Sequence, residues 1–153
     1  MTNEVFAEEP AWEKIADEVG ALLGTAWIAE HHSHIDYRVL AAYLPQWRPA
    51  GVIDTLRLAK ANSPGLPKCT LDALIEHLAP NLCEAPAQRH RAAFEAYATA
   101  QLLVVMASRY ETWDQLIASA VPPGLPGVPR TRNKSPPCGD ACSPPHDTES
   151  RRT

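Results

Sequence analysis

The segment 26–44 most limits what this chain can fold into, because its hydrophobic period changes within a few residues. A short apolar run, AWIA, ends at Glu30 and at a histidine-rich segment, 31–34. From Ile35 onward the apolar residues recur with the spacing of a helix. A short strand, a polar turn and an amphipathic helix in this order predict an α/β unit.

Asp36 is the first candidate functional residue. On a helical wheel for 35–44, the apolar residues fill one half, and Asp36 lies near the middle of that half. A charged carboxylate on a packed apolar face is costly unless a cation, a hydrogen-bond donor or a metal compensates it. Alternatively, Asp36 simply accepts backbone N–H bonds in the first helical turn, where acids are favoured.

Other segments continue the alternation of helix and strand. Residues 10–24 begin with proline, carry apolar residues every three or four positions and end with glycine, as amphipathic helices do. Residues 51–53 form a second short buried strand that ends at Asp54, and Asp54 caps a helix over 55–61. The order helix, strand, helix, strand, helix predicts a layer with parallel strands.

The remaining elements are helical. Thr70 is expected to cap a helix over 71–78. In a long helix over 88–110, the middle, 96–107, is apolar nearly all round, which indicates burial in the core or against a partner. A last helix covers 112–120.

Composition divides the chain into three parts. Residues 122–153 hold eight prolines and hardly any large apolar side chain, so they cannot bury enough surface to offset the entropy of ordering. We therefore predict a flexible lead-in over 1–9, one domain over 10–120 and a disordered Pro-rich tail over 121–153.

Charge and hydropathy exclude some classes of protein. The net charge of −4 gives no global basic field for nucleic acid, although 89–91 and 130–134 form local basic patches. No apolar run reaches 18 residues, and the N-terminus is acidic without the apolar core of a signal peptide. We expect no membrane span and a cytoplasmic location.

The four cysteines leave a zinc-binding alternative open. Cys138, Cys142 and His146 form a C-x3-C-x3-H string, whereas Cys69 and Cys83 lie far from it. The paired C-x2-C spacing of common zinc sites is absent, so free thiols are the favoured interpretation.

A third group of polar residues begins the long helix. His90 and Glu95 are five positions apart, about 140° around an ideal helix, so they face one site only if His90 precedes or begins the first turn. The alternative is an ion pair between Glu95 and Arg91 with a solvated His90.

Three ordered segments together resemble DEDDh-type 3'–5' exonucleases of the RNase H-like fold, such as the proofreading subunit of bacterial DNA polymerase III. HHSHIDYRVL, 31–40, is similar to the family's second motif, in which the Asp binds metal. VIDTLRLA, 52–59, resembles the segment that leads to the third motif. HRAAFEAYATA, 90–100, is similar to the third motif, in which His is the general base and an acid five residues later binds metal. The resemblance extends from about residue 12 to 103.

The resemblance implies roles for five residues. His90 would be the catalytic base, Asp36 and Glu95 metal ligands, and His31 and His32 substrate contacts. The implied cofactor is Mg²⁺ or Mn²⁺, and the implied substrate is the 3' end of single-stranded DNA. Two such ions, about 3.5–4 Å apart, activate the attacking water and stabilise the leaving oxygen in this chemistry.

The sequence also departs from the family pattern. No strand with the family's Asp-x-Glu motif precedes residue 27, so the first three strands and two of the four metal carboxylates have no counterpart. Glu95 stands where the family has Asp, and His32 stands where Asn is usual. We therefore expect a truncated RNase H-like exonuclease fold, mostly helical with two short parallel strands left of the sheet, that is inactive or weak alone.

Two other functions remain open. The chain could be a non-catalytic module that keeps the exonuclease helices and binds a protein partner through them or through its Pro-rich tail. A zinc-binding regulatory domain is the remaining alternative and rests on the cysteines and histidine of the tail.

Overall fold

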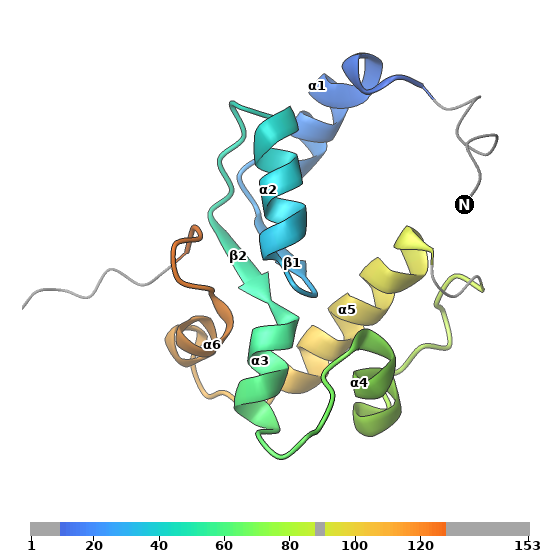
Figure 1. The fold of residues 1–153 in the computed structure, drawn as a ribbon, viewed down its shortest axis with the longest axis vertical. Helices are drawn as coiled ribbons and strands as arrows, with labels where there is room; N and C mark the ends of the chain where they lie inside the picture. Colours follow the sequence, from blue (N-terminus) through green and yellow to red (C-terminus); the bar gives the residue numbers. More distant parts are fainter. Residues whose placement is uncertain (1–9, 88–90, 128–153) are drawn as a thin grey trace, which may run out of the picture.

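The structure is a computed structural model that describes residues 10–87 and 91–127 (Figure 1). His90 and the segment 128–153 lie outside the described residues. In chain order the helices and strands are α1 (Trp12–Leu23), β1 (Trp27–Glu30), α2 (His34–Tyr43), β2 (Gly51–Asp54), α3 (Thr55–Asn62), α4 (Leu71–Leu78), α5 (Ala92–Ala107) and α6 (Trp113–Ala120).

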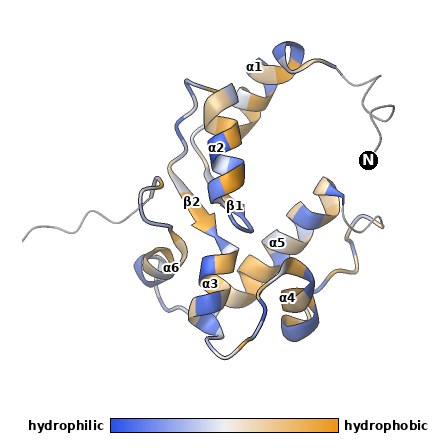
Figure 2. Cartoon of the chain, viewed as in Figure 1, coloured by the Kyte–Doolittle hydropathy of each residue, from blue (hydrophilic) through white to orange (hydrophobic). Residues whose placement is uncertain are grey.

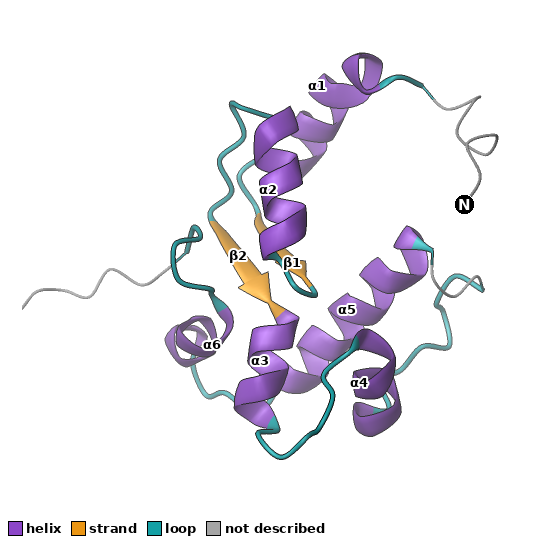
Figure 3. Ribbon diagram, viewed as in Figure 1, coloured by secondary structure: helices purple, strands orange, loops and turns teal. Residues whose placement is uncertain are grey.

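The two strands form a parallel pair (Figure 3). Trp27 lies opposite Gly51, and Glu30 lies opposite Asp54, so both strands end at the same edge. The chain crosses from β1 to β2 through α2, as a parallel connection requires. This confirms the expected mostly helical α/β fold with two short parallel strands.

Local sequence signals set the ends of the helices. Gly24 ends α1 with a φ of 50°, a value that glycine adopts at little cost. The Asp54 carboxylate accepts hydrogen bonds from the N–H groups of Leu56 and Arg57, at 2.9 and 3.2 Å, and so caps α3. Thr70 caps α4 in the same way. The predictions made for these positions are confirmed.

The core cluster lies in the part of the described chain from β2 onward. Its buried cluster comes from β2 and the helices that follow it, namely Ile53, Leu58, Ala59, Leu74, Leu102, Met106, Leu116 and Ala120. Figure 1 shows β2 continuing directly into α3, with α4, α5 and α6 around it. Burial of these apolar side chains is the main favourable contribution to folding.

Only one face of α5 is buried, whereas its composition led us to expect burial all round. The side chains of Phe94, Ala98 and Leu102 are buried, but Val104 is 66% exposed.

No helix of the described ranges is long and apolar enough to cross a membrane.

The two helices before β2, α1 and α2, have the opposite character. Neither α1 nor α2 contains a buried residue. Leu22, Ile35, Val39 and Tyr43 are between 52% and 85% exposed, and Figure 2 shows hydrophobic segments on both helices. The expectation of a packed apolar face around Asp36 is therefore wrong, because Asp36, Ile35 and Val39 are all exposed.

The Trp27 side chain packs over the end of the sheet. Its ring meets that of Trp113 edge to face, with 5.0 Å between the ring centroids. A Cβ atom added at Gly51 or Gly127 would overlap the Trp27 ring. Both glycines are therefore sites where the backbone approaches an aromatic ring more closely than any other residue allows.

The segment after α6 also packs against the sheet. Val121 is buried, and the N–H group of Val52 donates a hydrogen bond of 3.0 Å to the carbonyl oxygen of Pro126. Residues 121–127 were expected to belong to the tail. The packed region instead continues to Gly127, because this segment satisfies backbone groups on the outer edge of β2.

Candidate functional site

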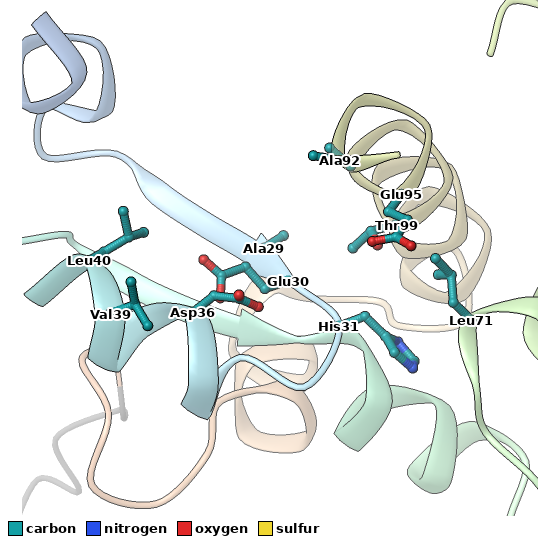
Figure 4. Close-up of a pocket in the computed structure, with 11 residues that line it drawn as sticks. Ala29, Glu30, His31, Asp36, Val39, Leu40, Leu71, Ala92, Glu95 and Thr99 are labelled. Carbon is teal, nitrogen blue, oxygen red and sulfur yellow. The ribbon is translucent and has the colours of Figure 1, made fainter. Parts of the chain in front are cut away.

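A cleft opens at the carboxyl end of β1, between α2 and α5 (Figure 4). Its volume is about 580 Å³. It is lined by Ala29, Glu30, His31, Asp36, Val39, Leu40, Leu71, Ala92, Glu95, Ala96 and Thr99. Because three of these residues are acids, we call it the acidic cleft. The carboxyl ends of parallel strands are where α/β proteins usually bind ligands.

Glu30 and Asp36 form one side of the acidic cleft. Glu30 ends β1, Asp36 lies in the first turn of α2, and Figure 4 shows their side chains next to each other. Burial, followed by the charge and hydrogen bond of Asp36 and the charge of Asp54, raises the pKa of Glu30 to about 7. Glu30 Oε2 is also buried without a hydrogen-bond partner. Glu30 therefore keeps its proton up to near-neutral pH.

Glu95 lies on the opposite side. It belongs to the first turn of α5 and is exposed, and Thr99 follows one turn later and is buried. Figure 4 shows the Glu95 and Thr99 side chains close together on the face of α5 next to the cleft. The fold thus brings Asp36 and Glu95, which are far apart in the sequence, to one cleft.

Asp54 is close to this group but already has a structural role. It is buried, and its Oδ1 atom accepts hydrogen bonds from the backbone N–H groups of His32, Leu56 and Arg57. This carboxylate holds the turn after β1 against the start of α3, so its main effect on the cleft is its negative charge.

His31 connects three segments through its ring. Nδ1 lies 3.0 Å from Thr55 Oγ1, and Nε2 donates to the carbonyl oxygen of Cys69 at 2.9 Å. Burial lowers the pKa of His31 from its ordinary value of 6.5. A direct hydrogen bond to a substrate would require one of these two bonds to break, so the predicted substrate contact stays a prediction.

His32 follows with an unusual backbone conformation. Its φ is 73°, in the left-handed region, and its side chain is exposed. Among non-glycine residues, Asn, Asp and His are enriched in this region. His32 is therefore compatible with this backbone conformation, as Asn would be. Its predicted contact with substrate is untested.

Only some of the residues with predicted roles can be placed relative to the cleft. Asp36 and Glu95 line the acidic cleft, whereas His90 lies outside the described residues and its role as a base stays a prediction. Sequence reasoning assigned no role to Glu30. The available signal was an acid directly at the end of an apolar strand, six positions before Asp36.

The cysteines add no site within the described residues. Cys69 and Cys83 are free thiols, as expected. The string formed by Cys138, Cys142 and His146 lies outside the part that the structure describes, so the zinc alternative is untested.

The acids of the cleft do not by themselves fit a two-metal centre. Across residues 10–87 and 91–127, no group of three or more His, Cys, Asp or Glu side chains is arranged to hold a metal ion. Glu30 and Asp36 lie together on one side and Glu95 on the other. The proton that Glu30 holds near neutral pH also competes with a cation, because metal ligands must be deprotonated.

Comparisons with known proteins place this fold. No family model matches the sequence. No curated protein matches it. Among solved structures, the chain is similar to "Exonuclease X in complex with 5' overhanging duplex DNA", with a TM-score of 0.60 and 28% sequence identity, over 76% of this chain and 66% of that chain. The described fold thus matches part of an exonuclease fold, and this chain spans just under two thirds of that protein's length.

Proposed function

We propose that this chain is part of a DEDDh-type 3'–5' exonuclease domain, and that the acidic cleft is the portion of the active site that this sequence contributes. The observation that carries the proposal is the meeting of Asp36 and Glu95 in one cleft. These are the two positions that the family resemblance assigns to metal ligands. The similarity to an exonuclease bound to duplex DNA supports the same function.

In this proposal the reaction is metal-dependent hydrolysis of a phosphodiester bond at a DNA 3' end. Asp36 and Glu95 would hold Mg²⁺ or Mn²⁺ in the complete site, and His90 would take the proton of the attacking water. The bound ions would supply charge stabilisation at the scissile phosphate. Since the described acids do not gather three ligands around one point, we infer that the chain alone hydrolyses DNA far more slowly than a complete member of the family.

The test is to complete the site. Fusing the family's N-terminal strands, with their Asp-x-Glu motif, to this chain should restore Mn²⁺-dependent release of mononucleotides from a 3'-labelled single strand. Asp36→Ala should remove the restored activity. Glu95→Asp should raise it, because the shorter side chain returns the carboxylate to the family's position and small displacements of catalytic groups are costly. His90→Ala should abolish most of the gain.

Asp72→Ala is the matched control for Asp36→Ala. Asp72 is also an exposed acid in the first turn of a helix, but it lies outside the acidic cleft. The fusion should keep its activity with this change. Strong, EDTA-sensitive digestion by the unfused chain that survives Asp36→Ala would place the chemistry elsewhere and overturn the proposal.

A second candidate is a non-catalytic module that binds a protein partner. The observation in its favour is that α1 and α2 bury no residue although both carry apolar side chains. A fusion that folds but stays inactive, while the chain binds a polypeptide through these helices, would favour this function.

A further inference from the structure

A second cavity lies where α1 meets the connection from α2 to β2. It has a volume of about 470 Å³ and is lined by residues of α1, by Gly24 and Thr25 after that helix, and by 43–48. The N–H group of Ala50 donates a hydrogen bond of 3.1 Å to the carbonyl oxygen of Thr25 and fixes the connection against the end of α1. We call this space the α1 cavity. It shares no lining residue with the acidic cleft.

Trp47 lines the α1 cavity with an unpaired hydrogen-bond donor. The residue is only 7% exposed, and its ring packs against that of Tyr37, with 6.0 Å between the ring centroids. Its Nε1–H group is buried and has no acceptor among the described residues. A buried donor without an acceptor destabilises the folded state, so a ligand that supplies an acceptor gains binding energy here.

Arg48 places a cation at the same cavity. Its Nη1 group donates to the carbonyl oxygens of Pro45 and Trp47, at 2.8 and 2.7 Å, which positions the guanidinium group. The Nε and Nη2 groups have no partner in the ranges that the structure describes. The guanidinium group therefore keeps two neighbouring N–H donors, the arrangement that binds both oxygens of a carboxylate.

Asp17 of α1 supplies the opposite charge. It lines the cavity and is exposed, and its carboxylate makes no hydrogen bond or ion pair with any described residue, Arg48 included. The α1 cavity thus combines one unpaired anion and one cation with apolar surface from Ala16 and Leu44. A ligand with a single charge would be attracted by one of the two groups and repelled by the other, whereas a zwitterion complements both.

We propose that the α1 cavity binds a small zwitterion with an ammonium group, a carboxylate and an apolar side chain, the chemistry shared by free apolar amino acids and short peptides. The carboxylate binds Arg48 and accepts the Nε1–H bond of Trp47, the ammonium group binds Asp17, and the apolar part contacts Leu44. The volume of the cavity is within the range of roughly 300–1,000 Å³ that is common for small-molecule sites. The proposal does not depend on nuclease activity.

NMR of the full chain tests the proposal, because each tryptophan gives one indole N–H resonance. The chain has four tryptophans, and Trp47→Phe identifies the resonance of Trp47. The probes are phenylalanine and the dipeptide alanyl-phenylalanine, and ligands of this size bind in about the millimolar range. Either probe should move the Trp47 resonance and the amides of 43–48 but not the resonances of Trp27 and Trp113. The tighter probe shows whether the ligand is a free amino acid or a peptide.

Two analogues test the two charges of the ligand. 3-Phenylpropionate keeps the carboxylate and lacks the ammonium group, whereas phenethylamine keeps the ammonium group and lacks the carboxylate. Each should bind about tenfold more weakly than phenylalanine, because each loses one charge-assisted hydrogen-bonding group.

Variants locate the two charges on the protein. Asp17→Asn and Arg48→Gln should each weaken binding of phenylalanine about tenfold. Glu18→Gln and Arg38→Gln are the controls, because these residues are exposed on α1 and α2 but do not line the α1 cavity. The controls should bind as the original chain does, and circular dichroism should show that all four variants fold.

Three outcomes would overturn the proposal. The first is a Trp47 resonance that neither probe moves at about 20 mM, well above the expected dissociation constant. The second is binding of 3-phenylpropionate or phenethylamine as tight as that of phenylalanine. The third is binding by folded Asp17→Asn and Arg48→Gln variants that equals binding by the two controls.

Discussion

The two strands of this protein are neighbours, yet their surroundings differ. β2 is buried along its whole length and leads into the helices that hold the core, whereas β1 joins two helices with no buried residue. Helices with amphipathic patterns occur both before and after β2. The difference teaches that such a pattern predicts a helix and its apolar face, but burial requires a second element against that face.

Truncating one leucine of α1 and one of α5 tests this contrast. It should give the largest change in stability of the predictions made here. Leu102 is fully buried and Leu22 is 85% exposed. We expect Leu102→Ala to lower the free energy of unfolding by about 3–4 kcal/mol, because it leaves a cavity in the core. Leu22→Ala should change it by less than about 0.5 kcal/mol. Urea unfolding followed by tryptophan fluorescence measures both, and equal losses would contradict the contrast.

A pair of glycines tests how the Trp27 ring holds β1 on β2. Gly51→Ala should destabilise the protein by about 1–3 kcal/mol, because the new methyl group overlaps the ring. Gly65 is the control, since nothing lies within 4 Å of a Cβ added there, and Gly65→Ala should be neutral or stabilise by up to about 1 kcal/mol. Similar effects of both changes on the melting temperature would show that the Trp27 ring moves freely.

His31 tests the connection between the end of β1 and the segments that follow β2. His31→Ala removes the ring bonds to Thr55 and to the carbonyl oxygen of Cys69, and it should cost about 1–3 kcal/mol of unfolding free energy. His34→Ala, at an exposed position of α2, should cost less than about 0.5 kcal/mol. If both variants unfold at the same urea concentration, the bonds from His31 to Thr55 and Cys69 do not stabilise the fold.

The smallest effect concerns Glu30 and depends on pH. The folded-state pKa of about 7 lies above the ordinary 4.5, so the folded state loses stability as pH rises from 4.5 through 7. Glu30→Gln removes this loss and should stabilise the protein by about 1 kcal/mol at pH 8, after allowance for partial solvent exposure. The gain should shrink towards zero at pH 5.

Glu13→Gln is the control for this titration, because Glu13 is an exposed acid of α1. Thermal unfolding between pH 5 and 8 should show no pH-dependent gain for that variant. A Glu30→Gln gain of equal size at every pH would contradict the raised pKa of Glu30.

Features governed by neighbouring residues could be predicted from the sequence. Both strands, their parallel pairing, and the caps formed by Asp54 and Thr70 depend on local patterns and were predicted correctly. The shared cleft of Asp36 and Glu95 was expected because each is a lone acid at the edge of an apolar helical face and because both match metal-ligand positions of the resembling family. Their metal-binding role and that of His90 as a base remain predictions.

Features governed by distant contacts could not be predicted. Glu30 has a raised pKa because the fold buries it and also places Asp36 and Asp54 near it, and no local pattern reports either effect. The packing of 121–127 depends on a hydrogen bond with β2, which outweighs a proline-rich composition.

The sequence by itself determined where this chain forms helices and strands, since capping side chains and hydrophobic periods act within a few residues. Only the tertiary structure decided which apolar faces are buried and which acid has a raised pKa. These properties depend on groups that approach from distant parts of the chain. Burial and a low dielectric constant strengthen the electrostatic interactions between such groups.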